Sequence, residues 1–226
     1  MSAVSAVSGS APTRTIVQAE ALAFMAENPA PPGTSVITSL PDVSELPERG
    51  FAGWQSWFGE AARAVLRWVP EPGLVIFFQS DIREAGAWID KGYLVQRAAE
   101  AEQRVLLWHK IVCRHAPGTI SHGRANYSHL LCFAHAPRER IAHPGPDVLP
   151  DAGFKPWSKA MGVEACRLAC RFLREESETK LVVDPFCGHG TALAVANRYG
   201  FDALGVELST RKVRAAKRLE LPADES

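Results

Sequence analysis

The sequence lacks an excess of charge of either sign, because its 226 residues include 25 Lys+Arg and 25 Asp+Glu. Net charge therefore favours no class of partner. It also has no apolar stretch near the roughly 20 residues that span a bilayer. The N-terminus shows no basic segment followed by an apolar run, as a secretory signal would. We expect a cytoplasmic protein that does not enter a membrane.

Cysteine patterning is also missing. The five cysteines are an odd number without the spacing of a disulfide framework, which favours reduced thiols. Cys166 and Cys170 lie four residues apart on a predicted helix, but no second Cys/His pair has zinc-site spacing. The seven histidines are scattered along the chain. We therefore expect no metal site.

Neither internal repeats nor a break in composition divide the chain. A length of 226 residues suits one well-buried α/β domain and is short for two. The Ser/Ala-rich residues 1–12 are predicted to be disordered. We expect a single domain over residues 13–226 and make no prediction of the oligomeric state.

What is present is an alternation of strand and helix patterns. Short apolar runs predict strands at 35–38, 73–78, 105–113, 129–134, 181–183 and 203–206. Helices are predicted at 19–26, 53–69, 93–103, 159–174, 191–199 and 210–219. Alternating strands and helices are typical of a mostly parallel sheet covered on both faces. The two consecutive strands 105–113 and 129–134 predict an antiparallel edge.

The strongest chemical pattern spans 181–207. An apolar strand ends in Asp184, a turn with Gly188 and Gly190 follows, and after a helix the next strand ends in Glu207. Glycines permit a tight turn and a close approach of the backbone to a ligand. Ligands of parallel sheets bind at the carboxyl ends of strands, where an acid can hold the hydroxyls of a ribose. The pattern predicts a nucleoside-containing cofactor.

The cofactor that fits best carries positive charge. A dinucleotide site has a third glycine in its turn, where this sequence has Leu193. An acid directly before the turn, as with Asp184, suits a ligand with an ammonium and a sulfonium group. We therefore predict S-adenosylmethionine.

The run from Asp184 to Thr191, together with Gly205-Val-Glu-Leu208, resembles the cofactor motif of the DNA amino-methyltransferases. These enzymes modify exocyclic nitrogens of adenine or cytosine. In their permuted members the catalytic motif precedes the cofactor motif, as here. The resemblance implies a class I, Rossmann-like methyltransferase sandwich in circularly permuted order. It implies that S-adenosylmethionine is bound by Thr38, Lys155, Asp184, Pro185, Phe186, Cys187, Gly188, Gly190, Thr191 and Glu207.

One motif departs from this family. Its catalytic tetrapeptide is Asp/Asn/Ser-Pro-Pro-aromatic, whereas this chain has Ser39-Leu-Pro-Asp42. The aromatic that stacks on the target base is replaced by a carboxylate, which can orient or deprotonate an acceptor and so permits a nucleophile other than an amine. Alternatively, Asp42 only caps the following turn. The candidate catalytic residues are Ser39, Pro41 and Asp42.

The substrate is predicted from what surrounds the site. Only a short Pro-rich connection lies between residue 134 and the helix at 159, which leaves little room for a segment that reads DNA sequence. The loop 114–127 holds bases, histidines and a tyrosine suited to phosphates and stacking. We therefore favour RNA, in particular tRNA, whose loop bases are already exposed. The alternatives are a DNA adenine-N6 or cytosine-N4 methyltransferase, a binding module without catalysis, and a small-molecule methyltransferase.

Overall fold

An eight-stranded mixed sheet is the centre of the fold. The computed structural model describes residues 11–222, so most of the segment predicted to be disordered lies outside the described residues. The eight strands run in the order β1 (Arg14–Gln18), β10 (Asp202–Glu207), β9 (Leu181–Asp184), β2 (Thr34–Thr38), β3 (Val75–Gln79), β7 (Tyr127–Ala134), β6 (Val105–Cys113), β8 (Val148–Leu149). From β1 to β3 all neighbours are parallel, and β7 is antiparallel to both β3 and β6. The predicted mostly parallel sheet with an antiparallel edge is confirmed.

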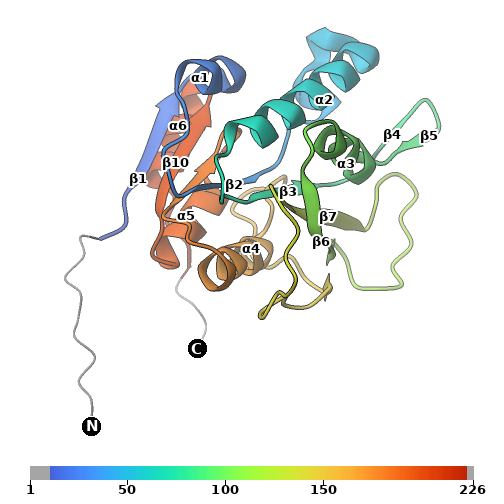
Figure 1. Ribbon diagram of the computed structural model, residues 1–226. Helices are drawn as coiled ribbons and strands as arrows, with labels where there is room; N and C mark the ends of the chain where they lie inside the picture. The colour runs from blue at the N-terminus through green and yellow to red at the C-terminus, as the bar shows by residue number, and fades with distance from the viewer. Residues whose placement is uncertain (1–10, 223–226) are drawn as a thin grey trace.

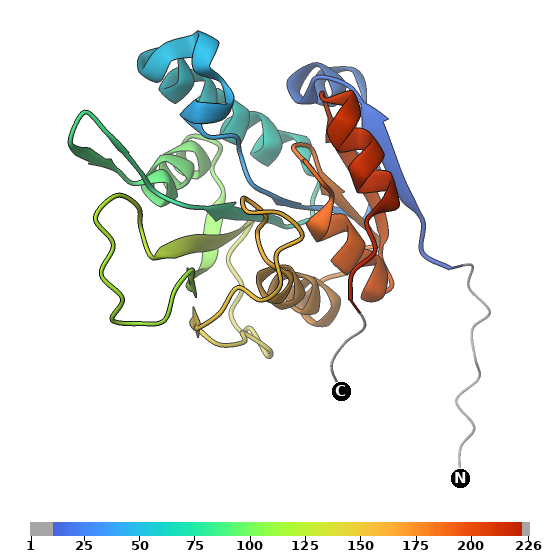
Figure 2. The same ribbon diagram turned by 180° about the vertical axis from the view of Figure 1, so that it is seen from behind.

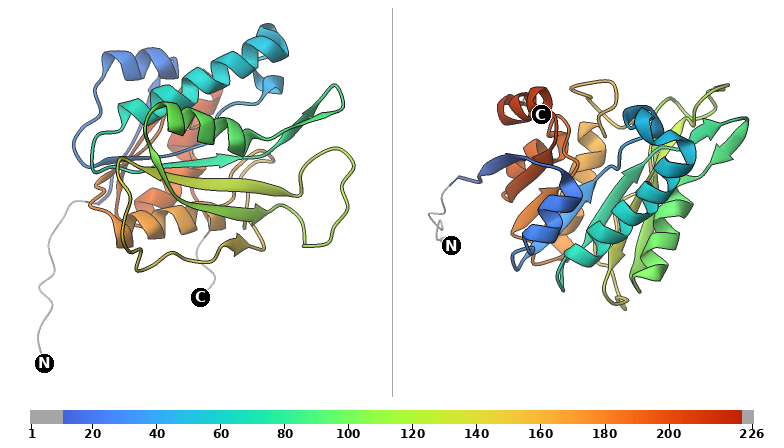
Figure 3. Two further views of the ribbon diagram at one scale, coloured as in Figure 1. Left: turned by 45° about the vertical axis from the view of Figure 1, so that its right-hand side comes forward. Right: turned by 90° about the horizontal axis from the view of Figure 1, so that it is seen from above.

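Helices cover both faces of this sheet (Figures 1 and 3). One face carries α1 (Ala21–Glu27), α2 (Gly50–Trp68) and α3 (Lys91–Ala101). The other carries α4 (Val163–Glu176), α5 (Thr191–Arg198) and α6 (Thr210–Arg218). Every residue of β2 and β3 is buried, as expected for strands covered on both sides. The predicted sandwich is therefore confirmed.

The strand order brings distant segments of the chain together. β1, near the start, pairs with β10, near the end, in parallel register (Figure 2). β2 lies between β3 and β9, so its carboxyl end is next to that of β9. The segment after β2 therefore lies beside the turn after β9, although it comes far earlier in the chain. This is the permuted arrangement that the sequence predicted.

Several short elements were not predicted. β1 was missed, and so were β8 and the hairpin of β4 (Ile82–Glu84) and β5 (Ala87–Ile89). These strands have at most five residues, too few to show the alternation of apolar and polar residues that identifies a strand. The turn of the hairpin has positive φ at Ala85 and Gly86, which matches the right-handed twist of two paired strands. α4 starts at Val163 and not at 159, after Gly162 with a φ of 92°.

Within residues 11–222, no helix combines the length and apolar character that crossing a membrane requires.

Ser35 tests the packing of the central strands. Its hydroxyl is fully buried, accepts a hydrogen bond from the Leu74 backbone N–H at 3.0 Å and lies 2.7 Å from the Thr179 hydroxyl. Ser35→Ala should lower the free energy of unfolding by about 1–3 kcal/mol, because a buried N–H loses its acceptor. Urea denaturation measures this, with the exposed Ser158→Ala as control. Equal stability of the two variants would contradict it.

Candidate active site

A cavity of about 410 Å³ opens at the carboxyl ends of β2, β9 and β10. We call it the β9 cavity. It is lined by nine of the predicted site residues: Ser39, Pro41, Asp184, Pro185, Phe186, Cys187, Gly188, Thr191 and Glu207. Its apolar walls include Trp57, Trp157 and Met161, which were not predicted. The fold thus gathers the motif after β9 and the segment after β2 around one space.

Asp184 is the most deeply buried carboxylate of this cavity, with 2% of its surface exposed. It accepts hydrogen bonds from the Thr38 hydroxyl at 2.6 Å and from the Phe186 N–H at 3.1 Å. Burial raises the pKa of Asp184 to about 7; the two hydrogen bonds oppose this rise and the charge of Glu207 adds to it. Near neutral pH the carboxyl therefore takes up or releases a proton when the charge beside it changes.

The β9 cavity is lined by two further polar groups, Glu207 and Thr191. Glu207 accepts a hydrogen bond from the Ser209 N–H at 2.7 Å, which fixes its carboxylate at the end of β10. The Thr191 hydroxyl, at the start of α5, is buried and has no hydrogen-bond partner among residues 11–222. A buried hydroxyl without a partner is unfavourable unless a ligand supplies one.

The two glycines of the turn have different roles. Both have positive φ, 52° at Gly188 and 80° at Gly190, which other residues rarely adopt. Gly188 lines the β9 cavity, whereas a Cβ on Gly190 would lie 3.0 Å from the Cβ of Ala216 in α6. Gly190 therefore lets α6 pack against the turn, and only Gly188 is placed for a close approach to a ligand.

The segment Ser39–Asp42 is held by its neighbours. Leu40 is buried, and the Pro41 carbonyl accepts a hydrogen bond from Trp54 Nε1 at 3.0 Å. Asp42 is the N-cap residue of the short helix η1 (Val43–Glu45), and its N–H donates to the Glu45 carboxylate at 3.4 Å. The Asp42 carboxylate is also ion-paired through Oδ1 with the ammonium of Lys91. Asp42 therefore occupies a capping position and in addition holds a charged partner that a cap does not require.

A second cavity, of about 260 Å³, adjoins the first. We call it the β3 cavity, because Phe78, Ser80 and Asp81 at the carboxyl end of β3 line it. Asp42 and Lys155 line this cavity and not the β9 cavity. Residues common to both cavities are Ser39, Leu40, Glu45, Lys159 and Ala160. The two spaces therefore meet at the segment after β2.

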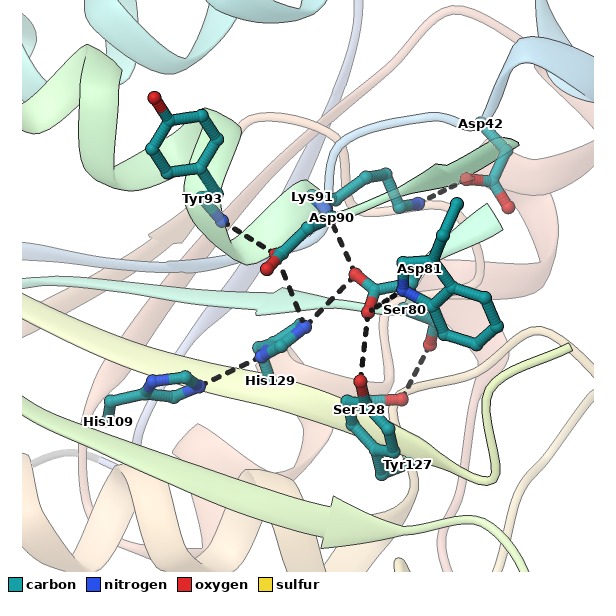
Figure 4. A network of polar contacts seen from close by, with 11 residues as sticks. Asp42, Ser80, Asp81, Asp90, Lys91, Tyr93, His109, Tyr127, Ser128 and His129 are labelled. Atoms are coloured by element: carbon teal, nitrogen blue, oxygen red, sulfur yellow. Dashed lines mark hydrogen bonds and ion pairs between the residues drawn. The ribbon is translucent and has the colours of Figure 1, made fainter. Parts of the chain in front are cut away.

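A network of polar contacts around Asp81 holds Lys91, the residue that is ion-paired with Asp42 (Figure 4). Asp81 accepts hydrogen bonds from the Lys91 N–H at 2.9 Å, Trp88 Nε1 at 3.1 Å and the Tyr127 hydroxyl at 3.2 Å. His129 Nε2 lies 3.0 Å from the same carboxylate. Burial raises the pKa of Asp81, but His129, the Lys91 N–H and Trp88 together outweigh it, so the pKa lies below its ordinary value. Asp81 thus fixes the start of α3, from which the Lys91 side chain reaches Asp42.

His129 continues this network. Its Nδ1 lies 2.9 Å from Nε2 of His109, on the neighbouring strand. Single ligand atoms of Asp81, Asp90 and His129 lie within 4.8 Å of one another. Both Asp81 oxygens already accept hydrogen bonds, two each, so the arrangement is explained without a metal. The sequence analysis missed Asp81 and Lys91, although Asp81 follows a predicted strand and Asp90-Lys91 starts a helix.

The fold is that of class I methyltransferases. Among solved structures, TTHA0409 from Thermus thermophilus, described as a proposed DNA modification methylase, has a TM-score of 0.68 at 20% identity, over 91% of this chain and 93% of that chain. Its complex with S-adenosyl-L-methionine has a TM-score of 0.67 at 21% identity, over 91% of both chains.

The cytosine-N4-specific PvuII DNA methyltransferase has a TM-score of 0.68 at 16% identity, over 96% of this chain and 92% of that chain. No family model matches the sequence. The search of curated proteins found no match. At these identities the similarity shows the fold.

Asp184 makes the stability of the free protein depend on pH. Its pKa of about 7 lies above the ordinary 3.8, so the folded state holds a proton that the unfolded state has lost between these values. The contribution of Asp184 to the free energy of unfolding is fully present below about pH 4 and is lost as the pH rises through about 7. The unfolding free energy of the wild type minus that of Asp184→Asn should therefore fall as the pH rises from about 4 to about 7, and should level off above that. Urea titrations from about pH 5 to about pH 8 measure it; a constant difference would contradict the assignment.

Proposed function

We propose that the protein is an S-adenosylmethionine-dependent methyltransferase that acts on nucleic acid, with DNA favoured over RNA. The observation that carries this proposal is the meeting of the two cavities at Ser39 and Leu40. One cavity has the acids for a nucleoside cofactor and a buried hydroxyl without a hydrogen-bond partner among residues 11–222. The other opens at the segment that resembles the catalytic tetrapeptide.

The β9 cavity fits S-adenosylmethionine in size and chemistry. Its 410 Å³ lies within the roughly 300–1,000 Å³ usual for small-molecule sites. Asp184 and Glu207 suit positive groups and ribose hydroxyls, and Thr191 offers a hydroxyl that lacks a partner among residues 11–222. Phe186 and Trp157 supply apolar surface. We expect these residues, with Gly188, to hold the cofactor, and Thr38 to act through its hydrogen bond to Asp184.

When bound, the cofactor supplies an electrophilic methyl group on its sulfonium. The residues of this chain orient the acceptor and its proton. Asp42 is ion-paired with Lys91 through Oδ1 alone, and a carboxylate has about four lone-pair sites, so Oδ2 can accept a hydrogen bond from an acceptor N–H. The Ser39 hydroxyl can accept one as well. We infer that Asp42 orients an exocyclic amine and that Lys91 fixes the carboxylate.

The comparisons support DNA and do not support the RNA preference of the sequence analysis. TTHA0409 is described as a proposed DNA modification methylase, and the PvuII enzyme as a cytosine-N4-specific DNA methyltransferase. This chain covers 93% of TTHA0409 and 92% of the PvuII enzyme. The short connection before α4 is therefore no argument against DNA, because chains of similar extent are described as DNA methylases.

Transfer of tritium-labelled methyl groups tests the proposal. The protein is incubated with labelled S-adenosylmethionine and either mixed-sequence DNA or bulk tRNA, and the label in each nucleic acid is counted. We expect label in DNA, as N6-methyladenine or N4-methylcytosine in a nucleoside digest. Label in tRNA alone would overturn the DNA preference. Cofactor binding without any transfer would identify a binding module.

Thr191→Val tests the cofactor site without removing a charge. The variant keeps the shape but loses a hydroxyl with no protein partner among residues 11–222. Stability should be unchanged or higher, while the affinity for S-adenosylmethionine should fall about two- to tenfold through one lost hydrogen bond. Calorimetric titration measures the affinity, with Ser35→Ala as a buried control distant from the ligand. Equal affinity in wild type and Thr191→Val would contradict this placement.

Asp42→Asn tests the orienting role. Single-turnover transfer should slow by about a hundredfold or more, because a misplaced acceptor loses most of the rate gained by orientation. Cofactor affinity should stay unchanged, since Asp42 does not line the β9 cavity. The double variant Asp42→Asn/Lys91→Met removes the buried cation that the single variant leaves unpaired. If the double variant regained the wild-type rate, Asp42 would serve only to neutralise Lys91.

A further inference from the structure

Three basic side chains converge on the β3 cavity from segments that are distant in sequence. Arg114 and Arg124 belong to the loop between β6 and β7, and Lys155 to the coil before α4. Arg114 and Lys155 are half-buried, and Arg124 is exposed. In Figures 1 and 3 the loop projects beyond the sheet on the same side as the β4–β5 hairpin. All three side chains line the β3 cavity.

These bases repel one another. Burial lowers the pKa of Arg114, and the charge of Arg124 lowers it further. Burial also lowers the pKa of Lys155, and here the charge of Arg114 adds to the effect. The charge of Asp42 raises the pKa of Arg114, and the charge of Asp151 raises that of Lys155. Both pKa values are nevertheless below their ordinary values. Holding like charges together at a half-buried site is unfavourable unless an anion binds there.

The acids that line the cavity are engaged elsewhere. Asp42 pairs with Lys91. Asp81 lies 3.0 Å from His129 Nε2. Glu45 lies 3.8 Å from Lys159 and 3.7 Å from Lys212. Among residues 11–222, no hydrogen bond or ion pair joins an acid to the side chains of Arg114, Arg124 or Lys155. Their charges are therefore available to a ligand.

The two adjoining cavities have opposite charge balances. The β9 cavity is lined by four acids and two bases: Glu20, Glu45, Asp184, Glu207, Lys159 and Lys212. The β3 cavity is lined by three acids and six bases: Asp42, Glu45, Asp81, Arg83, Lys91, Arg114, Arg124, Lys155 and Lys159. A cavity with an excess of one sign attracts ligands of the other sign. The β3 cavity therefore suits an anion, as the β9 cavity suits a cation.

We propose that Arg114, Arg124 and Lys155 bind a backbone phosphate of a nucleic-acid strand, beside the nucleotide whose base enters the β3 cavity. This assignment rests on the proposed function and adds how the strand is held. Phe78 is the only aromatic residue lining this cavity in the described part of the chain. Aromatic stacking typically contributes about 1–3 kcal/mol per base. Phe78 is itself buried, with 7% of its surface exposed, so it offers a base little surface for stacking. A phosphate contact supplies binding energy in its place.

The salt dependence of binding tests this site without an activity assay. A fluorescein-labelled 12-nucleotide single strand is titrated with protein at several salt concentrations, and binding is followed by anisotropy. Arg114→Gln and Lys155→Gln should each reduce the magnitude of the slope of log affinity against log salt, by up to about 0.7, the value for one phosphate contact to a single strand. Arg171→Gln, an exposed base on α4 that lines neither cavity, is the matched control and should keep the wild-type slope.

The outcomes separate this site from the proposed function. Slopes equal to wild type in both cavity variants, with unchanged affinity for S-adenosylmethionine as the check of folding, would overturn the phosphate site alone. A protein that binds neither S-adenosylmethionine nor the strand would overturn the proposed function. Adenosine monophosphate is the competitor that distinguishes a free nucleotide from a strand. We expect it to compete weakly, and displacement at the affinity of the oligonucleotide would overturn the assignment to a strand.

Discussion

The hydrogen bond from the Thr38 hydroxyl to Asp184 is the contact on which both cavities depend. It joins the carboxyl ends of β2 and β9, which are neighbours in the sheet although 146 residues separate the two side chains in sequence. Because β2 ends there, the segment Ser39–Asp42 continues directly from the edge of the β9 cavity into the β3 cavity. A shift of β2 against β9 would separate the cofactor motif from the tetrapeptide.

The polar groups around this contact have related functions in the proposed reaction. A deeply buried Asp184 with a pKa of about 7 can become charged when a positive ligand approaches. On the other side, Asp81 fixes the start of α3 and thereby the Lys91 side chain that is paired with Asp42. The carboxylate in place of the usual aromatic is thus part of a network that packs around it. This explains how the chain accommodates a tetrapeptide that differs from the family it resembles.

The sequence predicted the long elements and the motif after β9, because apolar runs and Gly-x-Gly turns are local signals. It did not predict the partner of Asp42, since the Asp42–Lys91 pair depends on how α3 packs against α2 and the strands β3, β6 and β7. The same holds for Gly190, whose missing Cβ makes room for α6 rather than for a ligand. Lys155 was assigned to the cofactor from the resemblance alone, whereas its side chain lines the β3 cavity with Arg114. Short strands such as β1 and β8 carry too few residues for a pattern and are fixed by their neighbours in the sheet.

The most direct test of the central claim is a crystal structure of the protein with S-adenosylhomocysteine. We predict density for the ligand in the β9 cavity, with its ribose at the Glu207 carboxylate and a polar atom within hydrogen-bonding distance of the Thr191 hydroxyl. The sulfur should face the segment at Ser39 and Leu40, where the β3 cavity begins. Ligand density outside the β9 cavity, or a sulfur that faces away from Ser39, would contradict the account.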